Sequence, residues 1–260
     1  IIGGLHPTIF SEDILKHEPT VDYVCIGEGE KTLQRLANGE SPSDIGGLGY
    51  RQNNEVKINK KNNFIEDLDG LPFPDFSLIN IEDYHLDTSE WINPKGLPIN
   101  VPMPIISSRS CPFGCNFCSM FLVHGKKFRP RSASNVVDEI EKIYNKYDQR
   151  YFSFFDDNFA LSKSRVMDIC DQITRRGLDI QFDTPNGLHI STLDNEVIDS
   201  LVSAGLVRIT VAPESGSSYI RNEIIGKKLS DEKIYNFFDI IKKYKDLFVQ
   251  ALFVYGFPQE

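Results

Sequence analysis

"LDIQFDTPNGLHISTLDNEVIDSLVSAGLVRITVAPE", residues 178–214, contains the alternation that decides the fold. Its first part, 178–184, has the composition of a buried strand, and "LVRITVA", 206–212, has that of a second one. Between them, "STLDNEVIDSLVSAG" predicts a helix with a Ser/Thr cap at its start and Gly205 as its stop. Strand, helix and strand in this order predict two parallel strands with the helix packed on their sheet.

The same alternation extends outward from this unit, beginning at residue 105. Short apolar runs of the strand type alternate with amphipathic stretches of the helix type, which gives five such units in about 150 residues. This spacing predicts an α/β fold in which a parallel sheet, covered by helices, curves into a partial or full (β/α) barrel. The further predicted elements are a strand in "PIISS" (104–108), a helix over 132–147, strands over 151–155 and 247–255, and helices ending at Arg176 and spanning about 230–245.

The first 64 residues predict a smaller α/β region. "VDYVCI" (21–26) reads as a buried strand that enters a glycine turn and a short helix ending near Gly39. "GLGYRQNNEVKIN" predicts a hairpin that turns at Asn53-Asn54, and "IIGGLHPT" (1–8) reads as the end of another buried strand. Proline-rich segments follow, so we expect a linker over 65–104 and the barrel over 105–260.

Composition restricts the classes of function. The net charge of −9 and a pI of about 5.1 argue against broad nucleic-acid binding, since each phosphate contact needs a basic side chain. No apolar run reaches the roughly 18 residues of a membrane span, and the N-terminus lacks the features of a signal peptide. Five cysteines without such a signal argue against a disulfide framework, so we expect a cytoplasmic protein.

Three of the cysteines lie within eight residues, as Cys111, Cys115 and Cys118 in "SSRSCPFGCNFCSMF" (107–121). They follow the first predicted barrel strand, where functional loops of parallel α/β sheets lie. One interpretation is zinc, with His124 as a fourth ligand, although structural zinc sites usually show two Cys-x2-Cys pairs. Another is three cysteines buried by chance. The third is an iron–sulfur cluster held by three thiolates, with one iron open to a ligand.

The cysteine spacing, with an aromatic residue before the last cysteine, resembles the signature of the radical S-adenosylmethionine (radical SAM) superfamily. "RSCPFGCNFCS", "FFDDNFA", "NGLHISTLDNEVIDSLVSAGLVRITVAPESGS" and "VYGFPQE" are similar to successive strand ends of that family's barrel. "IIGGLHPT", "VDYVCIGEGEKTL" and the linker "EDLDGLPFPDF" resemble the subgroup in which a Rossmann-like cobalamin-binding domain precedes the barrel. By this comparison the chain is a fragment that lacks the first half of the cobalamin domain and the end of the barrel after strand five.

The resemblance implies an enzyme. A 4Fe-4S cluster on the three cysteines would bind S-adenosylmethionine (SAM) and cleave it reductively to a 5′-deoxyadenosyl radical. Cobalamin-dependent methyl transfer or a related modification of a small-molecule substrate would follow, with an electron donor such as flavodoxin or ferredoxin. The alternatives are a radical SAM enzyme without cobalamin and, more distantly, a zinc-binding interaction module. The identity of the substrate does not follow from the sequence.

The resemblance also suggests residues that contact the cofactors. Polar or glycine residues at the predicted strand ends of the barrel are candidates for SAM: Asp156, Asp157, Asn186, Glu214, Ser215 and Gly256. Asn158 is a further residue that could assist them. Two glycine-containing loops of the N-terminal region are candidates for cobalamin: Gly3, Gly4 and Thr8 in one, and Gly27, Glu28 and Gly29 in the other.

Two groups of basic residues can each be interpreted in two ways. Arg208 lies within a predicted strand and either forms an ion pair at a helix interface or points inward to a carboxylate. The basic residues Lys126, Lys127, Arg129 and Arg131, just after the cysteines, form either a local binding patch or a solvated loop. The candidate residues also have structural interpretations, such as a helix cap for Asp156 and tight turns for the glycines.

Overall fold

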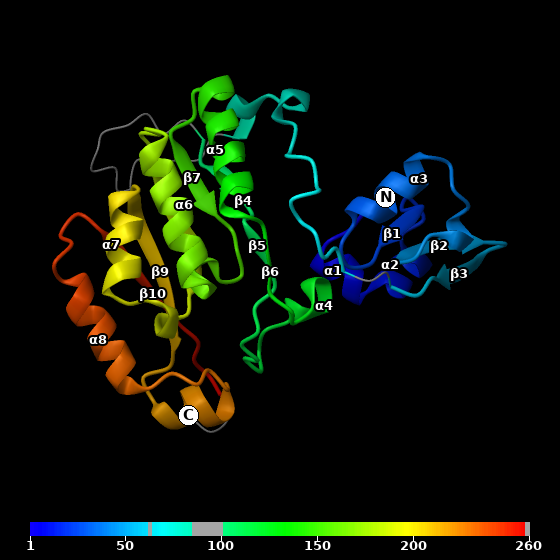
Figure 1. The fold of residues 1–260 in the computed structure, drawn as a ribbon. Helices are drawn as coiled ribbons and strands as arrows, with labels where there is room; N and C mark the ends of the chain where they lie inside the picture. Colours follow the sequence, from blue (N-terminus) through cyan, green and yellow to red (C-terminus); the bar gives the residue numbers. More distant parts are fainter. Residues whose placement is uncertain (62–63, 85–100, 258–260) are drawn as a thin grey trace. The chain divides into compact units, whose positions relative to one another are not determined.

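The computed structural model of the protein describes residues 1–61, 64–84 and 101–257. The chain divides into two compact units (Figure 1). Unit 1 comprises Ile1–Glu66 and Phe117–Lys127, and unit 2 comprises Asp67–Asn116 and Phe128–Glu260. Part of the predicted linker, residues 85–100, lies outside the described residues.

Unit 2 is built on a five-stranded sheet in the order β10-β9-β8-β7-β4. Every neighbouring pair in it is parallel, as the alternation of strands and helices predicts. The sheet and the helices that follow its strands confirm the partial barrel (Figure 1). The strands are β4 (Met103–Ile105), β7 (Tyr151–Phe154), β8 (Gln181–Leu188), β9 (Leu206–Glu214) and β10 (Phe248–Phe253).

Helices cover one face of this sheet (Figure 1). Phe152, Phe182 and Ile209 from three adjacent strands join apolar side chains of the helices in one buried cluster. Strands alternate their side chains between the two faces, so each neighbouring residue is directed away from the helices. The helices are α5 (Ala133–Tyr147), α6 (Lys163–Arg175), α7 (Asn195–Ser203) and α8 (Asp231–Ile241).

The face away from the helices is polar. Ser153, Asp183 and Arg208 lie side by side on β7, β8 and β9. The Nη2 atom of Arg208 donates a hydrogen bond to Oε1 of Gln250 on β10, with 2.6 Å between the atoms. Burial raises the pKa of Asp183, while its hydrogen bond with Ser153 and the charge of Arg208 oppose this shift. Of the two interpretations of Arg208, the structure supports the one in which its side chain points inward, away from the helices and toward Asp183.

Short elements complete unit 2. Two strands pair antiparallel beside the start of the barrel, and a π-helix follows β9. They are β5 (Ser108–Arg109), β6 (Arg129–Pro130) and η6 (Ile220–Ile224), with single 3-10 turns at η2 (Phe76–Leu78), η3 (Ile81–Tyr84), η4 (Phe159–Leu161) and η5 (Ile190–Thr192).

Unit 1 contains a three-stranded antiparallel sheet in the order β1-β2-β3. The predicted hairpin is confirmed, with Asn53 and Asn54 at positive φ of 52° and 63° between β2 and β3. The elements are β1 (Tyr23–Cys25), β2 (Leu48–Gln52), β3 (Glu55–Ile58), α1 (Leu5–Ile9), α2 (Ser11–His17), α3 (Glu30–Ala37), α4 (Phe121–His124) and η1 (Pro42–Asp44).

Three sequence predictions of local structure are wrong. The N-terminus is not a buried strand, because Ile2 forms one parallel bridge with Val24 and is 37% exposed. The cap of α7 is Asp194, which accepts a hydrogen bond from the Val197 amide, since the preceding Ser/Thr residues form the η5 turn. Strand β8 continues to Leu188 through an irregular register after Thr184, beyond the predicted end.

None of the helices in the described ranges combines the length and the hydrophobicity that a membrane span needs.

Candidate functional site

The cysteine loop follows β5, which pairs with β6 and is not part of the barrel sheet, so the loop does not come directly after β4, the first barrel strand. Cys111 and Cys115 belong to unit 2, Cys118 belongs to unit 1, and all three are partly buried. None of the five cysteines, all of which lie in the described part of the chain, forms a disulfide. Among the described residues, no group of three or more His, Cys, Asp or Glu side chains is arranged to hold a metal ion.

A buried carboxylate holds the chain just before this loop. Asp156 follows β7 and is 2% exposed. Its Oδ1 accepts a hydrogen bond from the amide of Ser107 at 2.6 Å, and its Oδ2 accepts from the hydroxyls of Ser107 and Ser108 at 2.6 and 2.5 Å. Burial raises the pKa of Asp156, against the effect of these hydrogen bonds. Both oxygens are thus engaged by the chain's own serines.

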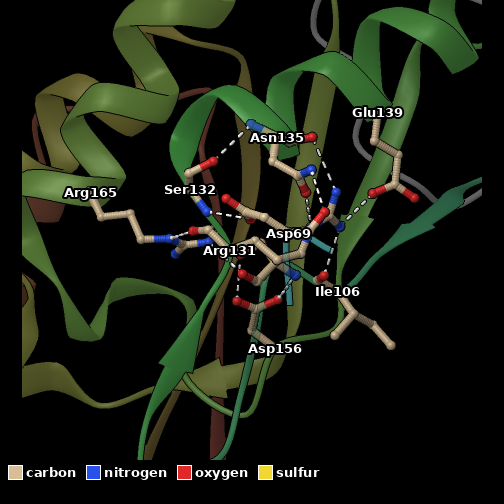
Figure 2. A network of polar contacts seen from close by, with 9 residues as sticks. Asp69, Ile106, Arg131, Ser132, Asn135, Glu139, Asp156 and Arg165 are labelled. Carbon is tan, nitrogen blue, oxygen red and sulfur yellow. Dashed lines mark hydrogen bonds and ion pairs between the residues drawn. The ribbon is translucent and has the colours of Figure 1, made fainter. Parts of the chain in front are cut away.

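Two arginines bind the carbonyl groups of the same segment (Figure 2). Arg131 Nη1 donates to the carbonyl of Ile106 at 3.0 Å, and Arg165 Nη2 donates to that of Ser107 at 2.6 Å. Arg165 Nε also donates to the carbonyl of Arg131 at 2.7 Å, so the two arginines are connected. Arg131 forms an ion pair with Glu139 on α5, with side chains 11% and 3% exposed. Arg131 is therefore part of a buried network and not of a solvated loop.

The proline-rich segment after unit 1 is attached to this network (Figure 2). Asp69 Oδ1 accepts a hydrogen bond from the amide of Ser132, the N-cap residue of α5, at 2.8 Å. The guanidinium of Arg131 lies 5.4 Å from the ring centre of Phe73, within the range of a cation–π interaction. The first part of the predicted linker is thus held on the barrel.

The cysteine loop is also held beyond Cys111. The ring of Phe113 stacks on that of His189, with centroids 3.9 Å apart and planes 9° apart. The backbone amide of Asn116 donates to the carbonyl of Ile225 at 2.9 Å, and its side chain donates to that of Ile224 at 2.6 Å. The π-helix after β9 therefore binds the same loop that β7 holds at its start.

His189 is a neutral, fully engaged imidazole. Its Nε2 lies 2.9 Å from the carbonyl oxygen of Lys227, and its Nδ1 lies 2.6 Å from the hydroxyl of Ser191. Burial lowers the pKa of His189 to about 4, while the hydrogen bond with Lys227 opposes this shift and the charges of Lys227 and Lys233 add to it. A neutral ring can stack on Phe113 without burying a charge.

We expect His189 to make the stability of the fold depend on pH. In the unfolded chain its pKa is close to 6.5, so below that pH the unfolded state binds a proton that the folded state excludes. The free energy of unfolding should fall by on the order of 3 kcal/mol between pH 6.5 and pH 4 on account of this group. Urea unfolding of the wild type and of His189→Gln across this range would measure it. Parallel pH profiles for the two proteins would contradict the expectation.

A buried ion pair lies at the end of β9. Glu214 Oε1 and Lys227 Nζ are 2.9 Å apart, and each side chain is 7% exposed. Glu214 has a positive φ of 69°, an uncommon conformation for a residue with a side chain. Next to it, Ser215 is buried and accepts hydrogen bonds from the Ser217 amide and from Nη1 of Arg221. The predicted strand-end residues are thus buried together.

The remaining barrel candidates belong to three different strands or the residues that follow them. Asp157 Oδ2 accepts a hydrogen bond from the amide of Ser110 at 2.9 Å. Asn186 lies within β8, not after it, and its Nδ2 donates to the carbonyl of Phe155 at 2.8 Å. Gly256 follows β10 at a φ of 96°. Asn158, which follows Asp157, is 2% exposed, and both polar atoms of its side chain lack a partner among the described residues.

The two glycine-containing loops of unit 1 lie side by side. The amide of Gly27 donates to the hydroxyl of Thr8, which lies in α1, at 3.0 Å. A Cβ atom on Gly3 would lie 3.4 Å from Cβ of Cys25, directly before the second loop. Glu28 Oε2 accepts a hydrogen bond from the amide of Ile65 at 2.7 Å. The other candidates of these loops are Gly4, at a φ of 103°, and Gly29, which precedes α3.

Several residues of the site were not identified from the sequence: His189, Lys227, Arg165 and Arg221. Arg221 is 1% exposed and donates to two carbonyl groups, of Ser215 and Leu229. A sequence signal existed only for Arg165, because a basic residue in the first turn of a helix is unusual, where acidic residues are favoured.

Comparison with known proteins agrees with this architecture. A family model described as the radical SAM superfamily matches residues 105–260. An uncharacterised methyltransferase of Pyrococcus horikoshii is 31% identical over all of this chain, which covers 54% of that relative. The anaerobic magnesium-protoporphyrin IX monomethyl ester cyclase of Cereibacter sphaeroides is 25% identical over the whole chain, which covers 42% of it. The chain thus spans about half the length of these relatives.

Among solved structures, the chain is similar to the radical SAM methyltransferase TsrM from Kitasatospora setae, in a structure with cobalamin and a [4Fe-4S] cluster bound. The TM-score is 0.73 at 18% identity, over 99% of this chain and 50% of that one. This likeness supports the fold, and the family model covers more than half of the sequence. The chain belongs to the radical SAM superfamily.

Proposed function

We propose that this chain carries the cofactor-binding part of an enzyme that cleaves SAM reductively with a 4Fe-4S cluster. The observation that carries the proposal is the loop with Cys111, Cys115 and Cys118 after β5, inside the region that matches the radical SAM family. Thiolates are the usual ligands of such clusters, and a set of three leaves one iron open. Such a cluster, when bound and reduced, would supply the electron that cleaves SAM into methionine and a 5′-deoxyadenosyl radical.

The donor set fits this cluster. All three residues of the loop offer sulfur, and their partial exposure leaves the thiols accessible to iron. The chain holds the loop just before Cys111 through Asp157 with Ser110, and between Cys115 and Cys118 through Asn116 with Ile224. We propose that the three sulfur atoms would hold the cluster.

Asn158 supports a SAM site at the end of β7. Its side-chain amide is buried and has both a donor and an acceptor without partners among the described residues. A buried polar group without a partner is costly, so a ligand with complementary polar groups would be stabilised there. The amino and carboxylate groups of SAM have this chemistry. We propose that Asn158 contacts SAM together with Asn186, Glu214, Ser215 and Gly256.

We expect Asn158→Ala to separate SAM binding from stability. The side chain forms no hydrogen bond in the described structure, so its removal should leave the melting temperature nearly unchanged. The dissociation constant for SAM should rise by about tenfold, the effect of one buried hydrogen bond to a charged group. Equilibrium binding of SAM to the iron-loaded protein, beside thermal unfolding, would test both parts. Unchanged affinity would contradict the assignment.

The reaction that follows SAM cleavage is proposed from the relatives. The relative from Pyrococcus horikoshii is named a methyltransferase, and TsrM is a methyltransferase that was solved with cobalamin bound. We therefore propose cobalamin-dependent methyl transfer, or a related modification, on a small-molecule substrate, with flavodoxin or ferredoxin as electron donor. The adjacent loops of unit 1, from Gly3 to Thr8 and from Gly27 to Gly29, would contact cobalamin.

Anaerobic preparation tests the proposal directly. The full-length protein, reconstituted with iron and sulfide and reduced with dithionite, should release 5′-deoxyadenosine from SAM. Zinc in place of iron would support the interaction-module alternative and overturn the proposal. Cobalamin that is retained through gel filtration would support methyl transfer, whereas SAM cleavage without cobalamin retention would support the alternative of a radical SAM enzyme that lacks it.

A further inference from the structure

We propose that Asp156 and Asp157 are positioning residues that fix the chain directly before the cysteine loop, so that the loop starts from one place and in one direction. This inference rests on the proposed iron–sulfur role of the cysteines. In this proposal both aspartates hold backbone amides of the chain in place, which differs from the predicted contact with SAM. The predicted contact stays a prediction, and the experiment below separates the two roles.

The contacts of Asp156 are complete without a ligand. Three donors surround its two oxygens at 2.5–2.6 Å, and all three come from Ser107 and Ser108. The carbonyl of Ser107 is bound in turn by the amide of Arg131 and by the guanidinium of Arg165. Each polar backbone or hydroxyl group named here therefore has a hydrogen-bond partner at the entry to the loop.

Asp157 binds the backbone of Ser110, the last residue before Cys111. Ser110 is 1% exposed and has a φ of 75°, in the left-handed region that costs free energy for a residue with a side chain. Its amide donates to Oδ2 of Asp157 at 2.9 Å. Since the conformation of Ser110 sets the direction in which the chain leaves β5, this bond stabilises the direction toward Cys111.

The geometry separates a positioning role from a charge-dependent one. Only the Ser107 amide requires an acceptor from Asp156, because hydroxyl groups can donate or accept. An asparagine could keep its oxygen toward this amide and turn its NH2 group toward the two hydroxyl oxygens. Asp156→Asn should therefore preserve the positioning, whereas Asp156→Ala should abolish it. A contact with the ammonium group of SAM would need the negative charge and would be weakened by both substitutions.

The experiment compares Asp156→Asn, Asp156→Ala, Asp157→Ala and the surface control Asp171→Ala in the full-length protein. Hydrogen exchange in the iron-free protein should show that amides around Ser107 and Ser110 exchange about tenfold faster in Asp156→Ala than in the wild type. After anaerobic reconstitution, the two alanine variants at 156 and 157 should retain several-fold less iron and show a broadened electron paramagnetic resonance signal. The asparagine variant and the control should match the wild type.

Each other outcome has a defined meaning. Wild-type exchange, iron content and resonance signal in Asp156→Ala would overturn the proposal. Equal loss of SAM affinity in the alanine and asparagine variants, with normal exchange and iron content, would overturn it in favour of a cofactor contact. If Asp156→Ala does not fold, the Ser107→Ala/Ser108→Ala double variant removes two of the same three hydrogen bonds and decides the question. A wild type that binds no iron would refute the proposed function, and exchange in the iron-free protein would still test the positioning.

Discussion

Alanine at Cys111, Cys115 or Cys118 is expected to reduce bound iron and the release of 5′-deoxyadenosine to background. The thiolate is the ligand of the cluster, and alanine supplies no replacement donor. Two sulfur ligands would leave a second iron exposed to solvent, so the cluster should be lost rather than weakened. Iron and sulfide analysis after anaerobic reconstitution would measure the effect, with SAM cleavage as a second measurement.

Cys170→Ala is the matched control for this loss. Cys170 lies in α6 and is 2% exposed, and burial raises the pKa of its thiol to about 12. A thiol that remains protonated is a poor metal ligand, so this variant should load iron like the wild type. Iron retention in the alanine variants of the loop, or loss of iron in Cys170→Ala alone, would refute the assignment of the three cysteines.

Glu214→Ala is expected to cause the largest loss of stability among single substitutions near the site. It leaves the ammonium group of Lys227 buried without its carboxylate, and breaking a buried ion pair in this way costs about 3–5 kcal/mol. Chemical denaturation at neutral pH would measure the change in the free energy of unfolding. Alanine keeps the positive φ at position 214, so the substitution relieves none of the backbone strain there.

A double variant tests the cause of this loss. Glu214→Ala combined with Lys227→Met removes the unpaired charge, so it should be more stable than Glu214→Ala alone. An additive loss in the double variant would show that the two side chains act independently. The same proteins also test the predicted SAM contact: SAM affinity that falls in Glu214→Ala and does not recover with Lys227→Met would support a direct contact of Glu214.

The sheet and its helices could be predicted because they depend on short-range patterns. The apolar face of α5 and the strand of β7 follow from periodicity, and a single parallel sheet follows from the alternation of the two. The fold of the whole region was therefore accessible from the sequence, and the resemblance at the cysteines agreed with it.

The partners within the site could not be predicted in the same way. Phe113 and His189 are far apart in sequence, and their stacking depends on where the π-helix and β8 place the loop. The bond from Arg165 to Ser107 likewise joins α6 to the chain before β5. Such contacts depend on the three-dimensional register of the sheet, which no local pattern contains. For the same reason, its place after a predicted strand marked Asp156 as a site residue. That place did not show whether Asp156 contacts SAM or holds the backbone of the chain.

The attachment of Asp69 and Phe73 to α5 affects where this protein can be cut for independent study. A truncated gene that begins at residue 105, the first residue of the family match, would remove Asp69 and leave the Ser132 amide without its acceptor. It would also remove the aromatic ring beside Arg131, whose guanidinium holds the strand end at Ile106. We therefore expect a stable barrel fragment to need the residues from about 67 onward, and not only those of the family match.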